Sequence, residues 1–192
     1  MSAGKPIATL RSNTGIPAGR LAVWWLLASE IVIFGGLIAA YLMARFAYPQ
    51  FGDFAANTNT WIGAFNTFVL LTSSLCAVLA HHAAESQNGR LAAKYLVFTI
   101  IGGLVFLCVK SFEWSMEISH GFTITANLFW SFYYTAAGLH ALHVIVGLAV
   151  MAWVAMSAAK GRELQRVEYV GLYWHFVDVV WIFLFPLLYI AR

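Results

Sequence analysis

Five uninterrupted apolar windows constrain the fold of this chain more than any other feature of its sequence. A helix needs roughly 20 mainly apolar residues to cross a hydrocarbon layer of about 30 Å, and each window reaches that length. The windows cover residues 21–44, 61–80, 95–116, 126–159 and 169–191. They predict an all-α polytopic membrane protein, built as a bundle of five transmembrane helices.

The shortage of charged residues supports the same class. The 192 residues include 11 Lys and Arg and 8 Asp and Glu, or 10% of the chain, whereas soluble domains average about 25%. A cytosolic enzyme and a disordered chain are therefore disfavoured. The formal net charge of +3 comes from basic residues scattered in short segments between the windows. Because they make no continuous basic face, no nucleic-acid partner is expected.

The same basic residues predict the orientation, since loops rich in Lys and Arg stay on the cytoplasmic side. The amino terminus is expected to face the cytoplasm and the carboxyl terminus the opposite side. Residues 1–20 are expected to form a short retained cytoplasmic tail, and residues 21–192 a single transmembrane domain. One side of the membrane collects eight basic residues, namely Lys5, Arg11, Arg20, Arg90, Lys94, Lys160, Arg162 and Arg166, and the other has two, Arg45 and Arg192.

Seven ionisable residues remain inside the windows, and each is costly to bury unless it is paired or neutralised. They are Glu30, Lys110, Glu113, His140, His143, His175 and Asp178. Each therefore suggests a functional site. The alternative is a structural one, in which an acid and a histidine on neighbouring helices hydrogen-bond each other and fix the packing.

Glu30 lies near the middle of the first window, on a helical face that continues through Phe34, Leu37 and Tyr41. A carboxyl group at that depth would be largely protonated, because burial disfavours its charged form. Two roles follow for Glu30, a structural hydrogen bond or the handling of a proton.

Lys110, Glu113 and Glu117 are spaced i, i+3 and i+7, so they share one helical face at the end of the third window. Long charged side chains near the end of a span can reach the aqueous interface. The spacing therefore predicts an interfacial ion-pair cluster that snorkels out of the membrane.

His140 and His143 lie on one stripe of the fourth window, between the small residues Ala136 and Gly147. In the fifth window His175 and Asp178 are three residues apart and neighbours on the helix surface. Spacing permits two interpretations, haem ligation by histidines of two helices or polar side chains that fasten helices together. Large neighbours such as Leu139 and Leu142 favour the second.

A metal site is not expected from the sequence, because no two windows offer three convergent His or carboxylate ligands. Cys76 and Cys108 lie inside apolar windows and have no CxxC neighbour. They are expected to be small buried hydrophobic residues and neither a disulfide nor a metal pair.

These polar residues lie in motifs that resemble subunit III of the haem–copper oxidases. The segment Tyr173–Leu184, YWHFVDVVWIFL, is similar to the Y/F-W-H-F-V/L-D-V-V-W segment of that family's last helix. The segment Gly138–Gly147, GLHALHVIVG, resembles its G-x-H-x-x-H-V-x-x-G motif. Weaker support comes from Ser29-Glu30, from Asn66-Thr67 with Ser73-Ser74, and from Phe112-Glu113-Trp114. The resemblance covers almost everything from Trp24 to Tyr189.

The resemblance implies the five-helix form of this subunit, found in bacterial cytochrome c and quinol oxidases of the cytoplasmic membrane. It implies an accessory subunit without catalytic residues that binds no haem or copper itself, since both belong to partner subunits. The chain would pack against catalytic subunit I in a complex with subunit II, bind phospholipid in a cleft between helix groups, and support proton uptake and stability of the complex. Membership of a respiratory supercomplex stays open.

The resemblance also assigns roles to individual residues. Glu30 matches the family's buried carboxylate, which reacts with carbodiimide. The other motif residues are candidates for structural polar contacts or for the lipid cleft, and they are Glu113, His140, His143, Trp174, His175 and Asp178.

Three alternatives remain at this point. A nitric oxide reductase system has a similar five-helix accessory protein. An independent transporter or proton channel would also account for acids inside the membrane. A b-type electron carrier would use His140 or His143 together with His175. The electron donor of an oxidase, whether cytochrome c or quinol, does not follow from the sequence.

Overall fold

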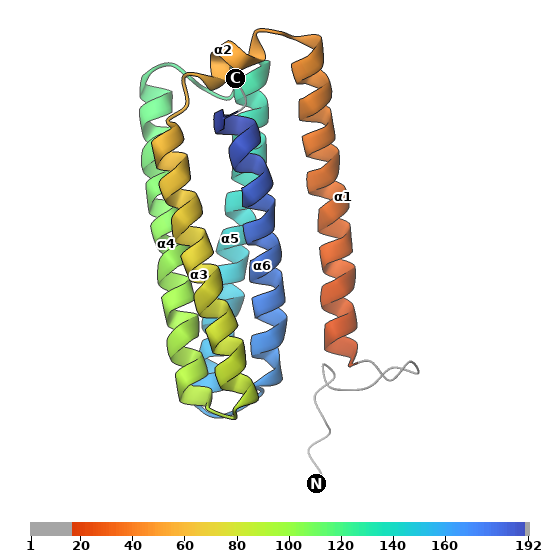
Figure 1. The fold of residues 1–192 in the computed structure, drawn as a ribbon, viewed down its shortest axis with the longest axis vertical. Helices are drawn as coiled ribbons and strands as arrows, with labels where there is room; N and C mark the ends of the chain where they lie inside the picture. Colours follow the sequence, from red (N-terminus) through yellow and green to blue (C-terminus); the bar gives the residue numbers. More distant parts are fainter. Residues whose placement is uncertain (1–16, 191–192) are drawn as a thin grey trace.

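The structure is a computed structural model that describes residues 17–190. Most of the expected amino-terminal tail, residues 1–16, lies outside the described residues, as do Ala191 and Arg192. The described part forms six α-helices and a π-helix (Figure 1). In chain order these are α1 (Ala18–Ala47), α2 (Phe51–Ala55), α3 (Thr60–Glu85), α4 (Gly89–Ser119), α5 (Leu128–Ala159), α6 (Gln165–Phe185) and η2 (Pro186–Ile190).

The five predicted transmembrane helices are confirmed. Within residues 17–190, five helices are long and apolar enough to cross a membrane: α1, α3, α4, α5, and α6 continued by η2. Most of them extend beyond the apolar windows, because a helix continues through polar residues until a cap ends it. The largest difference is α4, which has 31 residues and begins six residues before its window.

Asparagine side chains mark where three of these helices begin. Asn59 accepts hydrogen bonds from the backbone N–H groups of the first turn of α3, Asn88 from Leu91 in α4, and Asn127 from Trp130 in α5. The first N–H groups of a helix have no partner within the helix, so a side-chain oxygen at this position stabilises the end. Three of the five spans are thus started by a polar cap.

Helices α3, α4, α5 and α6 form an antiparallel bundle, and α1 runs along one side, packed mainly against α6 and also touching α5 (Figure 1). The start of α1 and the end of η2 lie at opposite ends of the bundle (Figure 1). The end that carries the start of α1 and the α3–α4 and α5–α6 turns is called the basic end here, because Arg20, Arg90, Lys94, Lys160, Arg162 and Arg166 lie there.

Close packing in the bundle depends on small residues. A Cβ added to Gly103 of α4 would lie 2.7 Å from side-chain atoms of both Leu148 and Trp174. The large indole of Trp174, only 1% exposed, therefore occupies the space that a side chain at position 103 would need. In this way Trp174, one of the predicted motif residues, becomes a core residue between α4, α5 and α6.

The short helix α2 lies between the first and second apolar windows, where no helix was predicted from the sequence. Its five residues give no helical periodicity. What orders the segment is Phe51, which is 2% exposed and packs its ring against Tyr41, Phe129 and Phe132. The connection between the first two spans is therefore folded onto the bundle.

The last span changes its hydrogen-bonding pattern at Pro186, where α6 passes into the π-helix η2. Proline has no N–H to donate, and single π-turns often form at such positions. The carbonyl groups at the end of η2 have partners elsewhere: the hydroxyls of Tyr41, Thr58 and Thr60 donate to the carbonyls of residues 187, 188 and 189.

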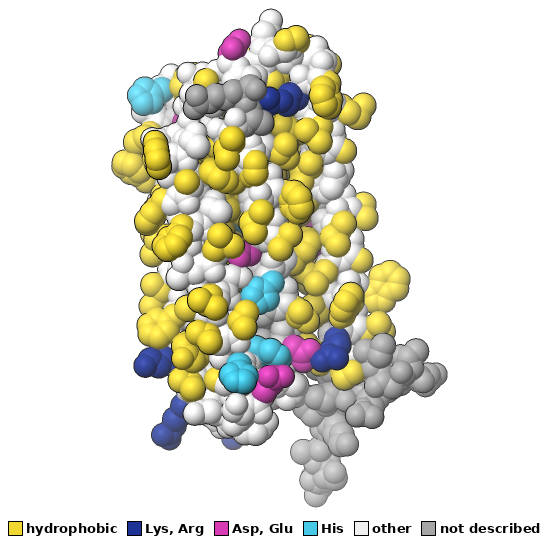
Figure 2. Space-filling model, viewed as in Figure 1, with side chains coloured by type: hydrophobic (Ala, Val, Ile, Leu, Met, Phe, Trp, Pro, Cys, Tyr) yellow, Lys and Arg dark blue, Asp and Glu magenta, His cyan; other side chains and the backbone are white. Residues whose placement is uncertain are grey.

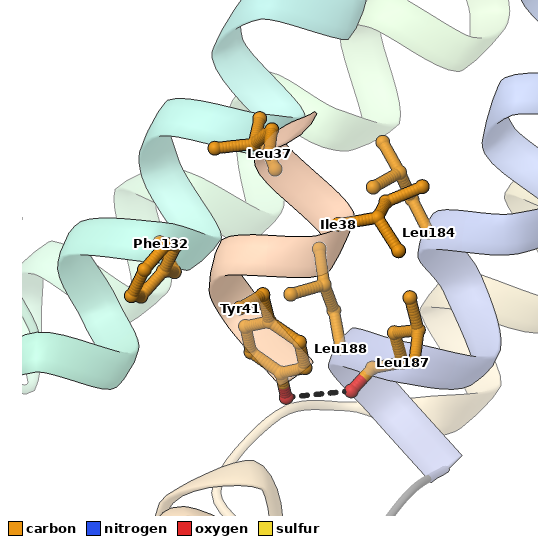
Figure 3. A pocket seen from close by; sticks show the side chains of 8 residues that line it. Leu37, Ile38, Tyr41, Phe132, Leu184, Leu187 and Leu188 are labelled. Atoms are coloured by element: carbon orange, nitrogen blue, oxygen red, sulfur yellow. Dashed lines mark hydrogen bonds between the residues drawn. The ribbon is translucent and has the colours of Figure 1, made fainter. Parts of the chain in front are cut away.

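Figure 3 shows the hydrogen bond of Tyr41, whose hydroxyl donates to the Leu187 carbonyl oxygen at 2.8 Å near Leu188. Ile38 and Leu184 line the other side of the same small cavity. The cavity among these side chains measures only about 10 Å³, which is barely room for one water molecule. This region is a packing contact that fastens α1 to the end of the chain.

The outer surface between the two ends is largely apolar, as the yellow side chains in Figure 2 show. Cys108 lies on this surface and Cys76 is half-buried. The expectation that both are buried hydrophobic residues is wrong for Cys108. An apolar surface facing lipid accommodates a thiol as easily as the core does, so burial inside the bundle did not follow from an apolar window.

Candidate functional site

Glu30 of α1 faces His143 of α5. Glu30 Oε2 and His143 Nε2 are 3.0 Å apart, without the alignment of a regular hydrogen bond, and the two side chains are 11% and 16% exposed. The edge of the Phe34 ring packs on the imidazole, with ring centroids 5.2 Å apart. The predicted face of α1 is confirmed, since Glu30, Phe34 and Tyr41 are its buried residues.

The other nitrogen of His143 determines what this pair can do. Nδ1 lies 2.8 Å from the backbone carbonyl oxygen of Leu139, an atom that only accepts, so Nδ1 carries a proton. A favourable contact between Nε2 and the Glu30 carboxyl group then needs one proton between them. That proton belongs either to a neutral acid or to an imidazolium. The Glu30–His143 pair is therefore a one-proton site on the seam between α1 and α5.

A second polar cluster is enclosed in the bundle around Lys110 of α4. Its ammonium group donates to Glu113 Oε2 at 3.1 Å, to the hydroxyl of Tyr133 at 2.9 Å and to the hydroxyl of Tyr189. The Tyr133 hydroxyl also donates to Glu113 Oε1 at 3.1 Å. The three donors of the ammonium group are thus all used, and this Lys110 cluster joins α4, α5 and η2.

The prediction that Lys110 and Glu113 snorkel to the interface is wrong. Their side chains are 2% and 0% exposed, and Glu117 is buried beside them. They are buried because Tyr133 of α5 and Tyr189 of η2 cover this face of α4 and supply hydrogen-bond partners. Aromatic rings surround the ammonium group, and those of Tyr133 and Tyr189 have centroids 4.6 and 5.0 Å from it. The ammonium group is therefore stabilised by cation–π contacts with these rings and not by water at the membrane surface.

His140 lies between the two sites and has no hydrogen-bond partner in the described chain. Its residue is fully buried, and neither ring nitrogen is bonded. The ring is packed between Phe106 and Trp181, at centroid distances of 5.5 and 5.1 Å. The Trp181 ring in turn has its centre 5.4 Å from Lys110 Nζ, so His140 is joined to the Lys110 cluster through this indole.

The motif on α6 is fastened to serines and a threonine of α3. Trp174 Nε1 donates to Ser73 Oγ at 3.1 Å, and Trp181 Nε1 donates to Thr67 Oγ1 at 3.0 Å. His175 Nδ1 and Ser74 Oγ are 2.6 Å apart. Asp178, which is 4% exposed, also interacts with the Ser74 side chain. His175 and Asp178 therefore contact α3. Two other residues of this motif also reach the histidines of α5, because Trp181 packs on the His140 ring and Tyr173 donates to the His143 carbonyl oxygen at 3.2 Å.

The three intramembrane histidines have three different environments. His143 faces α1, His140 lies among aromatic rings in the core, and His175 faces α3. The structure does not bring His175 together with either histidine of α5. Within the part of the chain that the structure describes, no group of three or more His, Cys, Asp and Glu side chains is arranged to hold a metal ion.

Comparison with known proteins identifies the family. A family model described as cytochrome c oxidase subunit III matches residues 9–191. The chain belongs to this family. Its polar sites are therefore those of a subunit III, and the resemblance seen in the motifs is confirmed.

Three relatives place the chain within the family. Cytochrome c oxidase subunit 3 of Thermostichus vulcanus is 32% identical, with 85% of this chain and 83% of the relative aligned. A probable quinol oxidase subunit 3 of Staphylococcus saprophyticus is 29% identical over 93% of this chain and 91% of the relative. A heme-copper oxidase subunit I+III of Aeropyrum pernix is 32% identical over 90% of this chain. This chain spans only 22% of that longer relative.

The residues that sequence reasoning missed in this subunit III are the partners of Lys110. Tyr133 and Tyr189 are 23 and 79 residues away from it in the chain. The sequence did contain one indication of them, because a lysine buried within a membrane span is energetically costly unless other helices supply hydrogen-bond acceptors for its ammonium group. That cost indicates that partners exist without indicating which side chains they are.

Proposed function

We propose that this chain is the accessory, non-catalytic subunit III of a respiratory haem–copper terminal oxidase in a bacterial cytoplasmic membrane. In this proposal it binds the catalytic subunit I, in a complex with subunit II, and the haem and copper belong to those partners. The observation that carries the proposal is the relative named as subunit I+III, in which a sequence similar to 90% of this chain is part of a longer oxidase polypeptide.

Affinity purification from native membranes tests the association. A tagged chain is expected to recover a larger haem-bearing subunit in equal amount, and the chain alone is expected to have no Soret absorption. Recovery of a nitric oxide reductase in place of an oxidase would show that the chain is an accessory subunit of that enzyme. A Soret band in the pure polypeptide would support the b-type electron carrier, and proton transport by the reconstituted chain alone would support an independent channel.

We further propose that the Glu30–His143 pair supports proton uptake by the oxidase. Its support is chemical, because a carboxyl group and an imidazole that share one proton can release it and take it up again without moving their helices. The pair is partly exposed at the α1 seam, whereas Glu113 is enclosed. The purified oxidase with Glu30→Gln is expected to take up protons more slowly during turnover and to inactivate sooner. Glu85→Gln, at an exposed acid of α3, serves as the matched control.

The remaining candidate residues are proposed to be structural. Glu113 stabilises the Lys110 cluster, Trp174 and His175 bind α6 to α3, and Asp178 contacts Ser74. His140 contributes core packing between Phe106 and Trp181. No catalytic or metal-binding role is proposed for any of them.

We propose that a phospholipid chain lies in the groove between α1, α5 and α6 near the basic end. The groove measures about 290 Å³. Its lining is mainly apolar and includes Val23, Leu26, Val146, Val150 and Tyr169. At its rim the Arg166 guanidinium lies 4.5 Å from the centre of the Trp153 ring. This arrangement suits an acyl chain in the groove and a phosphate near the arginine.

Native mass spectrometry of the oxidase with its lipids retained tests the groove. Val150→Trp, which fills the groove, is expected to remove one bound lipid for each copy of the chain. Val105→Trp, at an exposed position of α4, is the control and is expected to leave the lipid count unchanged. An unchanged count in the Val150→Trp variant would contradict the lipid proposal.

A further inference from the structure

The face shared by α3 and α6 carries polar groups that a lipid-facing surface should not have. Figure 2 shows His side chains and acidic side chains on this face, from the basic end up to about half the height of the molecule. His175 is half-buried here, and Asp178 lies beside it near the middle of the last span. Ionisable groups that face hydrocarbon are costly unless a partner pairs or neutralises them.

A cavity of about 160 Å³ opens between the two helices at this place. It is lined by Ala77, Val78 and His81 of α3 and by Glu168, Gly171, Leu172 and His175 of α6. Its volume suits one large side chain, and its walls combine small residues with polar ones. A second hollow of about 380 Å³ at the basic end shares His81 and Glu168 with it. The polar surface is therefore continuous from the end of the bundle to mid-membrane.

Gly171 has no role in the packing of this chain that would explain its missing side chain. A Cβ added there would meet no other atom within 4 Å, in contrast to Gly103, where the space is filled. Small residues in membrane helices permit close approach of another helix. Gly171 itself is buried, and the unfilled space beside it belongs to the α3–α6 cavity.

His175 has an unused hydrogen-bonding atom in the same cavity. Its Nδ1 is bonded to Ser74 Oγ, but its Nε2 has no hydrogen bond within the described residues. An acyl chain offers neither donors nor acceptors, so it cannot satisfy this Nε2. The apolar groove between α1, α5 and α6 has charge only at its rim and suits lipid, whereas the α3–α6 cavity suits protein.

We infer that the α3–α6 face is the docking surface for a transmembrane helix of the oxidase's catalytic subunit. That helix inserts one large side chain with a hydrogen-bonding group into the cavity beside Gly171 and His175. This inference rests on the proposed function. It specifies which face of the chain contacts the catalytic subunit and which chemical groups form that contact.

Gly171→Leu is the first test, because a Cβ at this position meets no atom of this chain within 4 Å and the longer side chain would extend into the cavity that Gly171 lines. The variant is expected to accumulate in membranes as the wild type does, but to recover at least tenfold less of the haem-bearing subunit on purification. Gly36→Leu on α1, where a Cβ also meets nothing within 4 Å, is the matched control and is expected to recover it fully.

Photo-cross-linking provides a second test that leaves Gly171 intact. A photoreactive residue at Leu172 in the assembled oxidase is expected to capture the catalytic subunit, and one at Val105 of α4 is expected to capture lipid. Capture of lipid alone from Leu172, or full recovery with Gly171→Leu, would overturn the docking surface and leave the proposed function standing. A wild-type chain that recovers no haem-bearing subunit would overturn both.

Discussion

Glu30 and Glu113 are both buried carboxyl groups within membrane spans, yet they have very different surroundings. Glu113 lies in the bundle interior, where one ammonium group and a tyrosine hydroxyl donate to it. Glu30 lies on a seam between helices and has one imidazole beside it. A fully enclosed acid needs fixed partners for its charge, so its role is to stabilise the fold. An acid on a seam has one partner here, and the contact of Glu30 with His143 needs a single proton between the two groups.

Lys110→Met should have the largest effect on the free energy of unfolding. It removes the ammonium group and leaves Glu113 buried and unpaired, which costs about 3–5 kcal/mol. Thermal or denaturant unfolding of the purified chain measures this loss. Lys94→Met, at an exposed position of the same helix, is the control. The double variant Lys110→Met with Glu113→Leu should regain part of the stability. A single variant as stable as the control would show that the cluster is not structural.

His143→Phe should cost less, about 1–3 kcal/mol, because the Glu30 carboxyl group then loses its partner but can become a neutral acid. Carbodiimide labelling of Glu30 should persist, since the carboxyl group is still present. His82→Phe, at an exposed histidine of α3, provides the comparison. If His143→Phe lowered the free energy of unfolding as much as Lys110→Met does, the Glu30–His143 pair would be as important for stability as the enclosed Lys110 cluster.

Tyr41→Phe should reduce the stability by about 0.5–1.5 kcal/mol. It removes the hydroxyl that donates to the Leu187 carbonyl and leaves the ring in place. Unfolding of this variant against Tyr48→Phe, at an exposed tyrosine, isolates the hydrogen bond. No difference between the two variants would mean that apolar packing alone holds α1 in place.

Glu30→Gln should change the stability least, by under about 1 kcal/mol, because the amide can still donate to His143 Nε2. Carbodiimide labelling at position 30 should disappear, and Glu113 should stay unlabelled in wild type and variant alike. Peptide mapping by mass spectrometry gives both results. Labelling of Glu113 in the folded wild type would remove the distinction between the two acids.

The spans and the face of α1 could be predicted from the sequence, because both depend on periodicity within a single helix. The polar partners could not, since a stripe on one helix does not say which side chains lie opposite. Lys110 illustrates this limit: the same i, i+3 spacing fits an interfacial ion pair and a buried one. The partners that decide between them, Tyr133 and Tyr189, come from α5 and η2. Helix α2 was missed for a related reason, because distant aromatic contacts order it.

The three hydroxyls that bind the carbonyls of η2 have a consequence for biosynthesis. Tyr41 of α1, with Thr58 and Thr60 just after it, bonds to residues 187–189 of η2. Helix α1 therefore receives these partners only after η2 has been synthesised. Until then α1 lacks its attachment to η2, and the Lys110 cluster lacks Tyr189. A chain in which η2 has not yet been made is thus distinguishable by its unsatisfied polar groups, which gives membrane proteases a physical basis for removing it.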